Sequence, residues 1–218
     1  AGPASNKLLG AQLNMKGFIT NSILPIPQEL MQGARKNAET LTELMNPEIE
    51  DAVAFIDICG FTAISEKEKP DTVVRMLNTY FDLMVKEILA QGGVIDKFIG
   101  DCVMAVFKGN YHLDRAIDAS LAIRKNIAAL PAEHSFVPQV SIGIRSGEMV
   151  SGNIGSATLK RLDFTVIGDT VNTAQRIQSV AGKNQIAIAA DDYEKVKLAF
   201  ECAEMGSFSL KNKEAEIG

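Results

Sequence analysis

The sequence predicts an α+β domain with a ferredoxin-like core, in the order strand–helix–strand–strand–helix–strand. Two observations support this prediction. Short apolar stretches alternate with segments whose apolar residues recur every three or four positions, and glycine-containing turns separate the predicted elements. The 218 residues, 46% hydrophobic and 22% charged, suit one globular domain with a short appendage.

Residues 1–50 are expected to be that appendage, outside the domain that begins at residue 51 and runs to 218. The first six residues are interpreted as a cloning remnant. Pro25 and Pro27 precede a helical stretch that ends at Pro47. Its narrow apolar stripe fits two interpretations, a helix packed on its own domain or a coupling helix that follows an upstream regulatory domain. The stripe consists of Leu30, Ala34, Ala38, Leu41 and Met45.

The first strand and helix of the core are predicted over about 51–58 and about 70–90. The strand is apolar and ends close to an acid, and the helix has apolar residues at helical spacing. Gly92 and Gly93 then end the helix. The predicted core-facing residues of the helix are Val73, Leu77, Tyr80, Phe81, Met84 and Ile88.

The second half of the core is predicted to contain a hairpin, a helix and a strand. Residues 94–107 read as two short strands around a turn at Gly100 and Asp101. A helix is expected over about 113–130, and the alternating residues 138–144 favour a strand.

Further elements are expected to extend the core. Residues 149–154 are predicted to pair with the preceding strand through a turn at 146–147. A strand then runs into a short helix over about 169–180, and a strand over 186–189 follows. The chain is expected to close with a C-terminal hairpin, whose last strand starts near Glu214 and is cut short.

Composition excludes several classes of protein. A net charge of −5 argues against a nucleic-acid-binding surface. Cys59, Cys102 and Cys202 are not at C-x-x-C spacing, which disfavours structural zinc and favours a reducing, cytoplasmic setting. We also expect no membrane span, because no apolar run approaches the roughly 20 residues that one requires.

Two acids are the strongest candidates for metal ligands. Asp57 lies at the end of an apolar strand, and Asp101 lies at a hairpin tip. A strand end and a hairpin tip joined by one helix can converge in space. Carboxylates without a basic neighbour in sequence suit hard cations such as Mg²⁺, and two of them suit a two-metal phosphoryl-transfer site.

A second group of polar residues could bind a nucleotide. Asn172 and Arg176 are four residues apart and share one helix face. They could orient a ribose and meet a phosphate, or they could be a capping amide and a surface cation. Asp169 is expected to cap that helix. Lys97 is predicted to project to the same side of its strand as Asp101, either as a donor to a base or phosphate or as a solvated lysine.

Four motifs in order resemble the catalytic domain of class III nucleotidyl cyclases, over residues 51–217. Each motif alone would be weak, whereas their order and spacing are specific. They span residues 55–62, 97–101, 143–147 and 168–176. The resemblance implies an adenylyl cyclase, which converts ATP to cyclic AMP and pyrophosphate.

The resemblance also implies the role of each site residue. Two Mg²⁺ ions, which Mn²⁺ could replace, would be held at Asp57, Ile58 and Asp101. The base would be selected by Lys97 and Thr165. Asn172 would orient the ribose, Arg176 would stabilise the transition state, and Lys211 would bind the triphosphate. Phosphate oxygens would be bound by the backbone amides of Cys59, Gly60, Phe61 and Thr62.

In that family the metals and the base are bound by opposite subunits, so a head-to-tail homodimer with two sites is implied. Two positions depart from the commonest pattern. Thr165 stands where many adenylyl cyclases have Asp, as in a subgroup that includes cyanobacterial and bicarbonate-responsive enzymes. Glu148 stands where some members have a phosphate-contacting Arg.

Three alternatives stay open. Guanylyl cyclase is the nearest, and Lys97 disfavours it, because that specificity usually uses a Glu. A diguanylate-cyclase-like enzyme would need an acid after Gly92 and Gly93, where the chain has Val94. A catalytically silent regulatory domain is the third, and the intact candidate residues argue against it.

Overall fold

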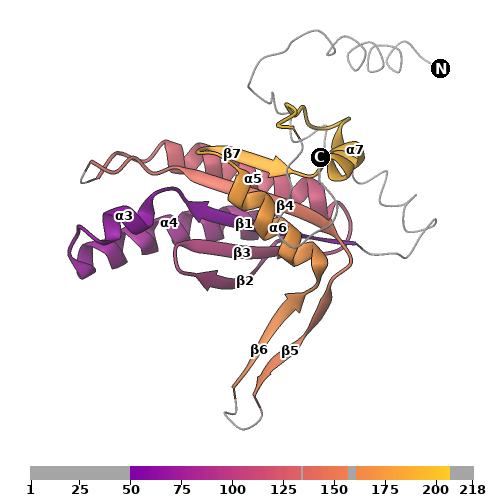
Figure 1. The fold of residues 1–218 in the computed structure, drawn as a ribbon, viewed down its shortest axis with the longest axis horizontal. Coiled ribbons are helices and arrows are strands. Elements are labelled where there is room, and N and C mark those ends of the chain that lie inside the picture. The colour runs from indigo at the N-terminus through magenta and orange to yellow at the C-terminus, as the bar shows by residue number, and fades with distance from the viewer. Residues whose placement is uncertain (1–49, 134, 157–160, 207–218) are drawn as a thin grey trace, which may run out of the picture.

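The computed structural model describes residues 50–133, 135–156 and 161–206 (Figure 1). Its centre is a five-stranded sheet with the strand order β2-β3-β1-β4-β7. All neighbouring pairs are antiparallel except β4 and β7, which are parallel. The predicted ferredoxin-like α+β core is confirmed, with β7 added at one edge. The strands are β1 (Asp51–Ile58), β2 (Val94–Ile99), β3 (Cys102–Phe107), β4 (Val140–Gly147) and β7 (Gln185–Ile188).

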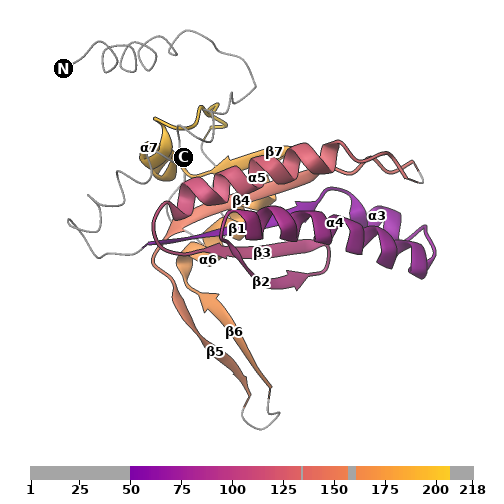
Figure 2. The same cartoon turned by 180° about the vertical axis from the view of Figure 1, so that it is seen from behind.

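Helices cover both faces of this sheet. The two long helices, α4 and α5, lie on one face, and α6 lies on the other (Figures 1 and 2). Two short helices, α3 and α7, were not predicted. The helices are α3 (Phe61–Ser65), α4 (Pro70–Ala90), α5 (His112–Ala128), α6 (Asp169–Val180) and α7 (Ala190–Val196).

The alternation of side chains along β1 explains why this strand is central. Even-numbered residues from Ala52 to Ile58 are buried against α4 and α5, whereas Val53 and Phe55 are buried on the side of α6. Because side chains of a strand alternate between faces, Asp57 continues the row of Val53 and Phe55. The side chain of Asp57, the candidate metal ligand, therefore projects from the face of the sheet that carries α6.

The hairpin of β2 and β3 agrees with the prediction. Ile99 pairs with Cys102, so the loop contains only Gly100 and Asp101. Gly100 has a φ of 62°, a conformation that glycine adopts without steric cost. The turn fixes Asp101 at the end of β3.

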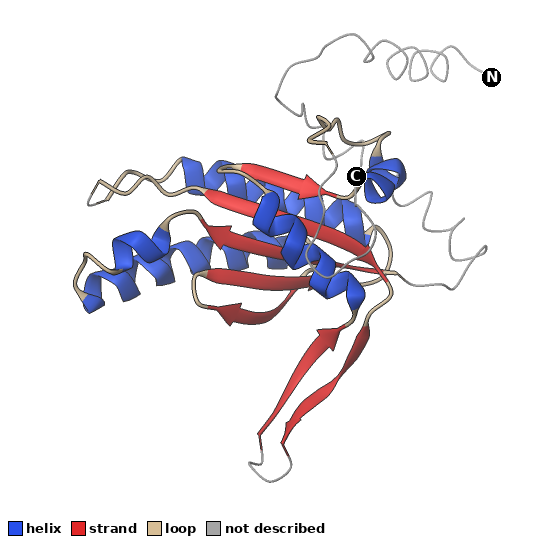
Figure 3. Ribbon diagram, in the orientation of Figure 1, coloured by secondary structure: helices blue, strands red, loops and turns tan. Residues whose placement is uncertain are grey.

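The predicted partner of the strand near residue 150 was wrong. Strand β5 (Val150–Ser156) pairs with β6 (Arg161–Ile167) in a separate two-stranded sheet, and not with β4. The two strands extend away from the main sheet (Figure 3). The physical reason is that both edges of β4 are already used, one by β1 and the other by β7.

Helix α6 lies directly on the backbone of β4. A Cβ atom at Gly143 would lie 2.1 Å from the amide nitrogen of Gln178 and 2.6 Å from the carbonyl oxygen of Ala174. Any larger residue at position 143 would therefore push α6 off the sheet, and Gly143 sets the height of the helix that carries Asn172 and Arg176.

Other predictions concern residues that lie outside the described parts of the chain. These are the N-terminal coupling helix, the C-terminal hairpin and Lys211. Among the described helices, none combines the length and the apolar character needed to cross a bilayer.

Candidate active site

Asp57 and Asp101 lie at one end of the β1–β3 pair. Asp57 is the antiparallel partner of Cys102, and Asp101 immediately precedes Cys102 in the turn. Burial, and to a smaller extent the charge of Asp101, raises the pKa of Asp57 from 3.8 to about 6. A nearby cation would relieve both causes, because it favours the charged form. The structure thus brings the two predicted metal ligands together.

The chemistry of this pair suits a hard cation. Burial, helped by the charges of Asp57 and Asp101, raises the pKa of the Cys102 thiol to about 12, so the thiol beside the pair is protonated at neutral pH in the metal-free protein. No group of three or more His, Cys, Asp or Glu side chains that could hold an ion occurs in the described parts of the chain. Mg²⁺ typically takes one or two carboxylates plus substrate phosphates and water. Ile58, the third predicted contact, is buried at the end of β1.

The raised pKa of Asp57 predicts a pH-dependent cost to folding. Since the pKa is higher in the folded state, the contribution of Asp57 to stability is full below about 3.8 and is lost as pH rises through about 6. In chelator at pH 7.5, Asp57→Asn is therefore expected to stabilise the protein by about 1 kcal/mol after solvent screening, or roughly 2–4 °C in Tm. Thermal unfolding at pH 3.5 should show no such gain. An equal gain at both pH values would contradict this origin.

The segment after β1 only partly matches the predicted phosphate cradle. The amide of Cys59 donates to the carbonyl oxygen of Gln139 at 2.8 Å, so the prediction that it binds phosphate is corrected. The amides of Gly60, Phe61 and Thr62 open α3, where the first N–H groups have no partner within the helix. Gly60 makes the entry possible with a φ of 76°.

The side chain of Phe61 holds this segment in place. It is 4% exposed, and its ring makes edge contacts with the rings of Tyr80 and Phe136 at centroid distances of 6.2 and 6.1 Å. Phe61 thus has a packing role, and only its backbone is available to a ligand.

Lys97 and Thr165, the predicted base-selecting pair, meet at Asp96. One carboxylate oxygen of Asp96, Oδ2, accepts a hydrogen bond from the Thr165 hydroxyl at 2.8 Å and lies 3.3 Å from the Lys97 ammonium. The other oxygen, Oδ1, accepts from the amide of Val166 at 3.3 Å. Sequence reasoning missed Asp96, although an acid inside an apolar strand and next to Lys97 was a usable signal.

A β-bulge explains how Asp96 reaches this position. The register of β2 against β3 shifts between Ile95 and Lys97, so Asp96 is the extra residue. Bulges re-aim side chains in this way. Beyond the bulge, Lys97 pairs with Met104 and Ile99 pairs with Cys102, which keeps Lys97 and Ile99 on one face as predicted.

Asn172 and Arg176 share one face of α6, as predicted, and line an open hollow of about 370 Å³ with Gln175, Gln178 and Ser179. Nη1 of Arg176 is buried and has no hydrogen-bond partner within the described residues. A buried unpaired guanidinium nitrogen is costly, so it is suited to an anionic ligand. Asp169 does not cap α6, because the N-cap is Gly168 and Asp169 is the first helical residue.

One chain holds the candidate residues as two separate sets. No hydrogen bond or ion pair links the pair Asp57 and Asp101 with the set of Lys97, Thr165, Asn172 and Arg176 in the described parts of the chain. The first set lies at the β1–β3 end and the second on β2, β6 and α6, and the β2–β3 hairpin carries both Lys97 and Asp101.

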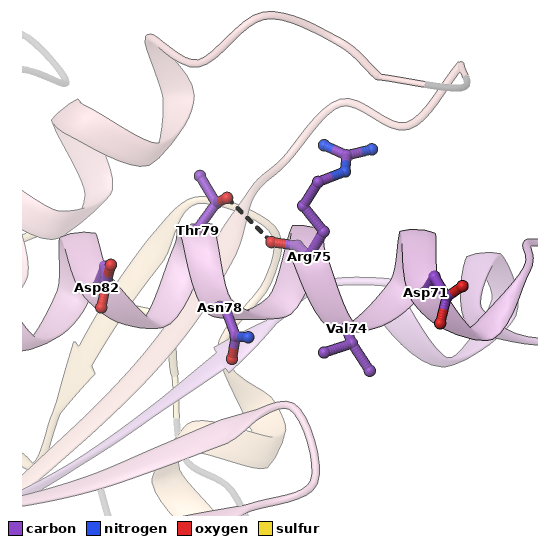
Figure 4. A pocket seen from close by; sticks show the side chains of 6 residues that line it. All are labelled: Asp71, Val74, Arg75, Asn78, Thr79 and Asp82. Carbon is purple, nitrogen blue, oxygen red and sulfur yellow. Dashed lines mark hydrogen bonds between the residues drawn. The ribbon is translucent and has the colours of Figure 1, made fainter.

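A larger hollow, of about 460 Å³, lies on the exposed side of α4 (Figure 4). All its lining residues come from that single helix, and one of its polar groups, the Thr79 hydroxyl, is bonded to the carbonyl oxygen of Arg75 at 2.9 Å. The chemistry of the lining gives no reason to prefer this surface over the sites above. Its lining residues are Asp71, Val74, Arg75, Asn78, Thr79 and Asp82.

The fold and these residues define a nucleotide cyclase catalytic domain. Residues 45–218 match the family described as the adenylate and guanylate cyclase catalytic domain, and the chain belongs to that family. Domains of this family bind nucleotide, act as dimers and generally use divalent metal ions.

Both branches of the family are represented among similar proteins. An adenylate cyclase of Anabaena cylindrica is 35% identical over 173 residues, which cover 76% of this chain and 34% of that protein. The crystal structure of the adenylyl cyclase CyaB from P. aeruginosa has a TM-score of 0.70 at 30% identity, covering 78% of this chain and 91% of that chain. A guanylyl cyclase structure has a TM-score of 0.64 at 29% identity, covering 79% of this chain and 91% of that chain.

The chain spans only part of the curated relatives. It covers 26% of an uncharacterised Mycobacterium tuberculosis protein that is 36% identical over 139 residues, and about a third of the Anabaena enzyme.

Proposed function

We propose that this domain is an adenylyl cyclase, which forms cyclic AMP and pyrophosphate from ATP. The observation that carries the choice of ATP is the meeting of Lys97 and Thr165 at Asp96. The test is to incubate the purified chain with ATP or GTP and Mg²⁺ or Mn²⁺ and to quantify both cyclic nucleotides. Cyclic AMP is expected as the main product, and the absence of both products would overturn the proposal.

The reaction is intramolecular. The ribose 3′-oxygen forms a bond to the α-phosphorus, the bond from that phosphorus to the bridging oxygen breaks, and pyrophosphate leaves with the electron pair while the hydroxyl loses its proton. Divalent ions bound at the two acids would acidify the hydroxyl and bind the triphosphate.

The residues of the chain would position and stabilise the reacting groups. Asp57 and Asp101 would hold the ions, and the amides that open α3 would bind phosphate oxygens. Asn172 would orient the ribose. Arg176 would offset the charge that grows on the transferring phosphoryl group, and its buried Nη1 has no competing partner among the described residues. Lys211 would bind the triphosphate.

The base preference follows from the donors and acceptors. Adenine has an acceptor at N1, which suits the Lys97 ammonium, and an exocyclic amine, which the Thr165 hydroxyl can accept. Guanine presents an N1–H donor that an ammonium cannot accept. A buried unsatisfied donor costs about 1–3 kcal/mol, or roughly ten- to hundredfold in preference. Guanylyl cyclase is the second candidate, because solved guanylyl cyclases resemble this chain as well.

We further propose that the working form is a head-to-tail homodimer, in which each site takes the metal-binding acids from one subunit and the second set from its partner. The dimers that catalytic domains of this family form support this arrangement. A regulatory domain elsewhere in a longer protein is also proposed, since the curated relatives are about three or four times as long as the matched segment. A cytoplasmic location is proposed from the free cysteines Cys59, Cys102 and Cys202, which suit a reducing setting.

Mixing Asp57→Ala with Arg176→Ala is expected to restore activity that neither variant has alone. Random exchange makes half of the dimers mixed, and one of the two sites in each mixed dimer keeps every wild-type residue, so about a quarter of the wild-type activity should return. Activity is measured after subunit exchange has been verified by labelled subunits. The matched control mixes Asp57→Ala with Asp101→Ala, which share a half-site and should not complement. Failure of the first mixture despite exchange would refute the shared site.

A further inference from the structure

Asp96 is surrounded by donors. It accepts from the Thr165 hydroxyl and the Val166 amide, and the Lys97 ammonium lies 3.3 Å away. Its side chain is only 6% exposed. An ionised carboxylate has only acceptor positions and no donor. The groups of Thr165, Val166 and Lys97 that contact it therefore act as donors.

This arrangement fixes the direction of the Thr165 hydroxyl. A hydroxyl has one proton, and two acceptors compete for it, namely Oδ2 of Asp96 at 2.8 Å and the carbonyl oxygen of Val166 at 3.4 Å. The carboxylate offers the shorter and charge-assisted bond, which is about twice as strong as a neutral one. The proton therefore goes to Asp96, and only lone pairs of Thr165 are left for a ligand.

We infer that Asp96 is a specificity-determining positioning residue, which makes Thr165 an obligate acceptor and so favours a base with an exocyclic amine. This inference rests on the proposed binding of ATP at Lys97 and Thr165. Asp96 need not touch the base. Without it, the Thr165 hydroxyl could rotate and donate to the carbonyl oxygen that guanine carries at the same place.

The contact with Lys97 is the weaker part of this cluster. The Lys97 side chain is 40% exposed, and ion pairs of exposed lysines contribute little. The bond from Thr165 is made by a residue that is 6% exposed. The effect of Asp96 on base choice is therefore expected to act mainly through Thr165.

The test is Asp96→Asn, read out by binding. Oxygen is expected to stay on the fixed amide of Val166, which places the new NH₂ group against Thr165 and turns the hydroxyl proton toward the ligand. Affinities for 3′-deoxy-ATP and 3′-deoxy-GTP are measured with Mg²⁺, since these analogues lack the attacking hydroxyl and cannot turn over. The preference for the adenine analogue should fall at least tenfold, the scale expected for one reversed hydrogen bond. An unchanged preference would overturn the inference.

A double-mutant cycle separates positioning from packing. In a Thr165→Val background, which removes the hydroxyl at nearly constant shape, adding Asp96→Asn should change the preference less than about twofold. A full effect in that background would place the influence on Lys97 or on packing, and would overturn the inference. Thr165→Ser, which keeps the hydroxyl, should retain the wild-type preference.

Ser151→Ala is the control for a loosened β5–β6 pair. The Ser151 hydroxyl accepts from Lys108 Nζ at 3.0 Å, a side-chain link between this pair and the residue that follows β3. Its loss should leave base preference unchanged. An effect as large as that of Asp96→Asn would assign Asp96 a merely structural role.

One measurement needs no variant. The 3′-deoxy triphosphate of purine riboside lacks the exocyclic amine, and the wild-type protein should bind it about tenfold more weakly than 3′-deoxy-ATP. Equal affinities would also overturn the inference, even if Asp96→Asn did not fold. A lack of cyclase turnover, by contrast, would overturn the proposed function while these binding comparisons still decided the role of Asp96.

Discussion

Asp57→Ala and Asp101→Ala are each expected to reduce cyclase activity to a few per cent of wild type or less, with the fold intact. The two carboxylates lie together at the β1–β3 end, where the metal site is proposed. Burial and repulsion already raise the pKa of Asp57. Removing either acid therefore takes away repulsion and a metal ligand, and leaves the apolar residues of the core unchanged.

Activity is measured at saturating ATP over a range of Mg²⁺ and Mn²⁺ concentrations, and folding is followed by circular dichroism. Asp82→Ala is the matched control, because Asp82 is an exposed acid on the hollow of α4 and should be dispensable. Substantial activity in either site variant would refute the metal assignment. A loss of folding would instead assign the acid a structural role.

Arg176→Ala is expected to lower kcat by roughly 10²–10³, with a smaller effect on KM, the scale seen when one donor to the transition state is removed. The buried Nη1 of Arg176 lacks a protein partner among the described residues, so this nitrogen can donate a hydrogen bond to an anionic ligand. Lys183→Ala is the matched control, because it removes an exposed cation that follows the same helix and does not line the hollow. A change confined to KM would show that Arg176 only binds substrate.

Most of the core could be predicted, because periodicity and turn chemistry decide it locally. The bounds of β1 and α4 match the predicted ranges, and Gly100 alone specifies the turn of the hairpin. The failures are of another kind. An alternating strand carries no information about its partner, so β5 was paired with β4 although β6 is its partner.

The site was predictable to a similar extent. The predictions that Asp57 and Asp101 lie together and that Asn172 and Arg176 share one face of α6 agree with the structure, because they depend on residue type and spacing, whereas the roles of these residues stay predictions. The amide of Cys59 was misassigned, because its partner, Gln139, is 80 positions away and only the folded chain brings it close. Asp96 was missed for a related reason, since a bulge, and not simple alternation, decides where it points.

The close approach at Gly143 also matters for protein engineering. Helix α6 packs directly against the backbone of Gly143, with no side chain between them, and this contact fixes the distance between the helix and the sheet. Ala174 and Gln178, on the side of the helix that faces the sheet, therefore cannot be replaced by larger residues without moving the helix. Its outward side carries Asn172 and Gln175, which are exposed. A designer could thus change the polar groups that the helix presents to solvent while the backbone contact beneath it stays the same.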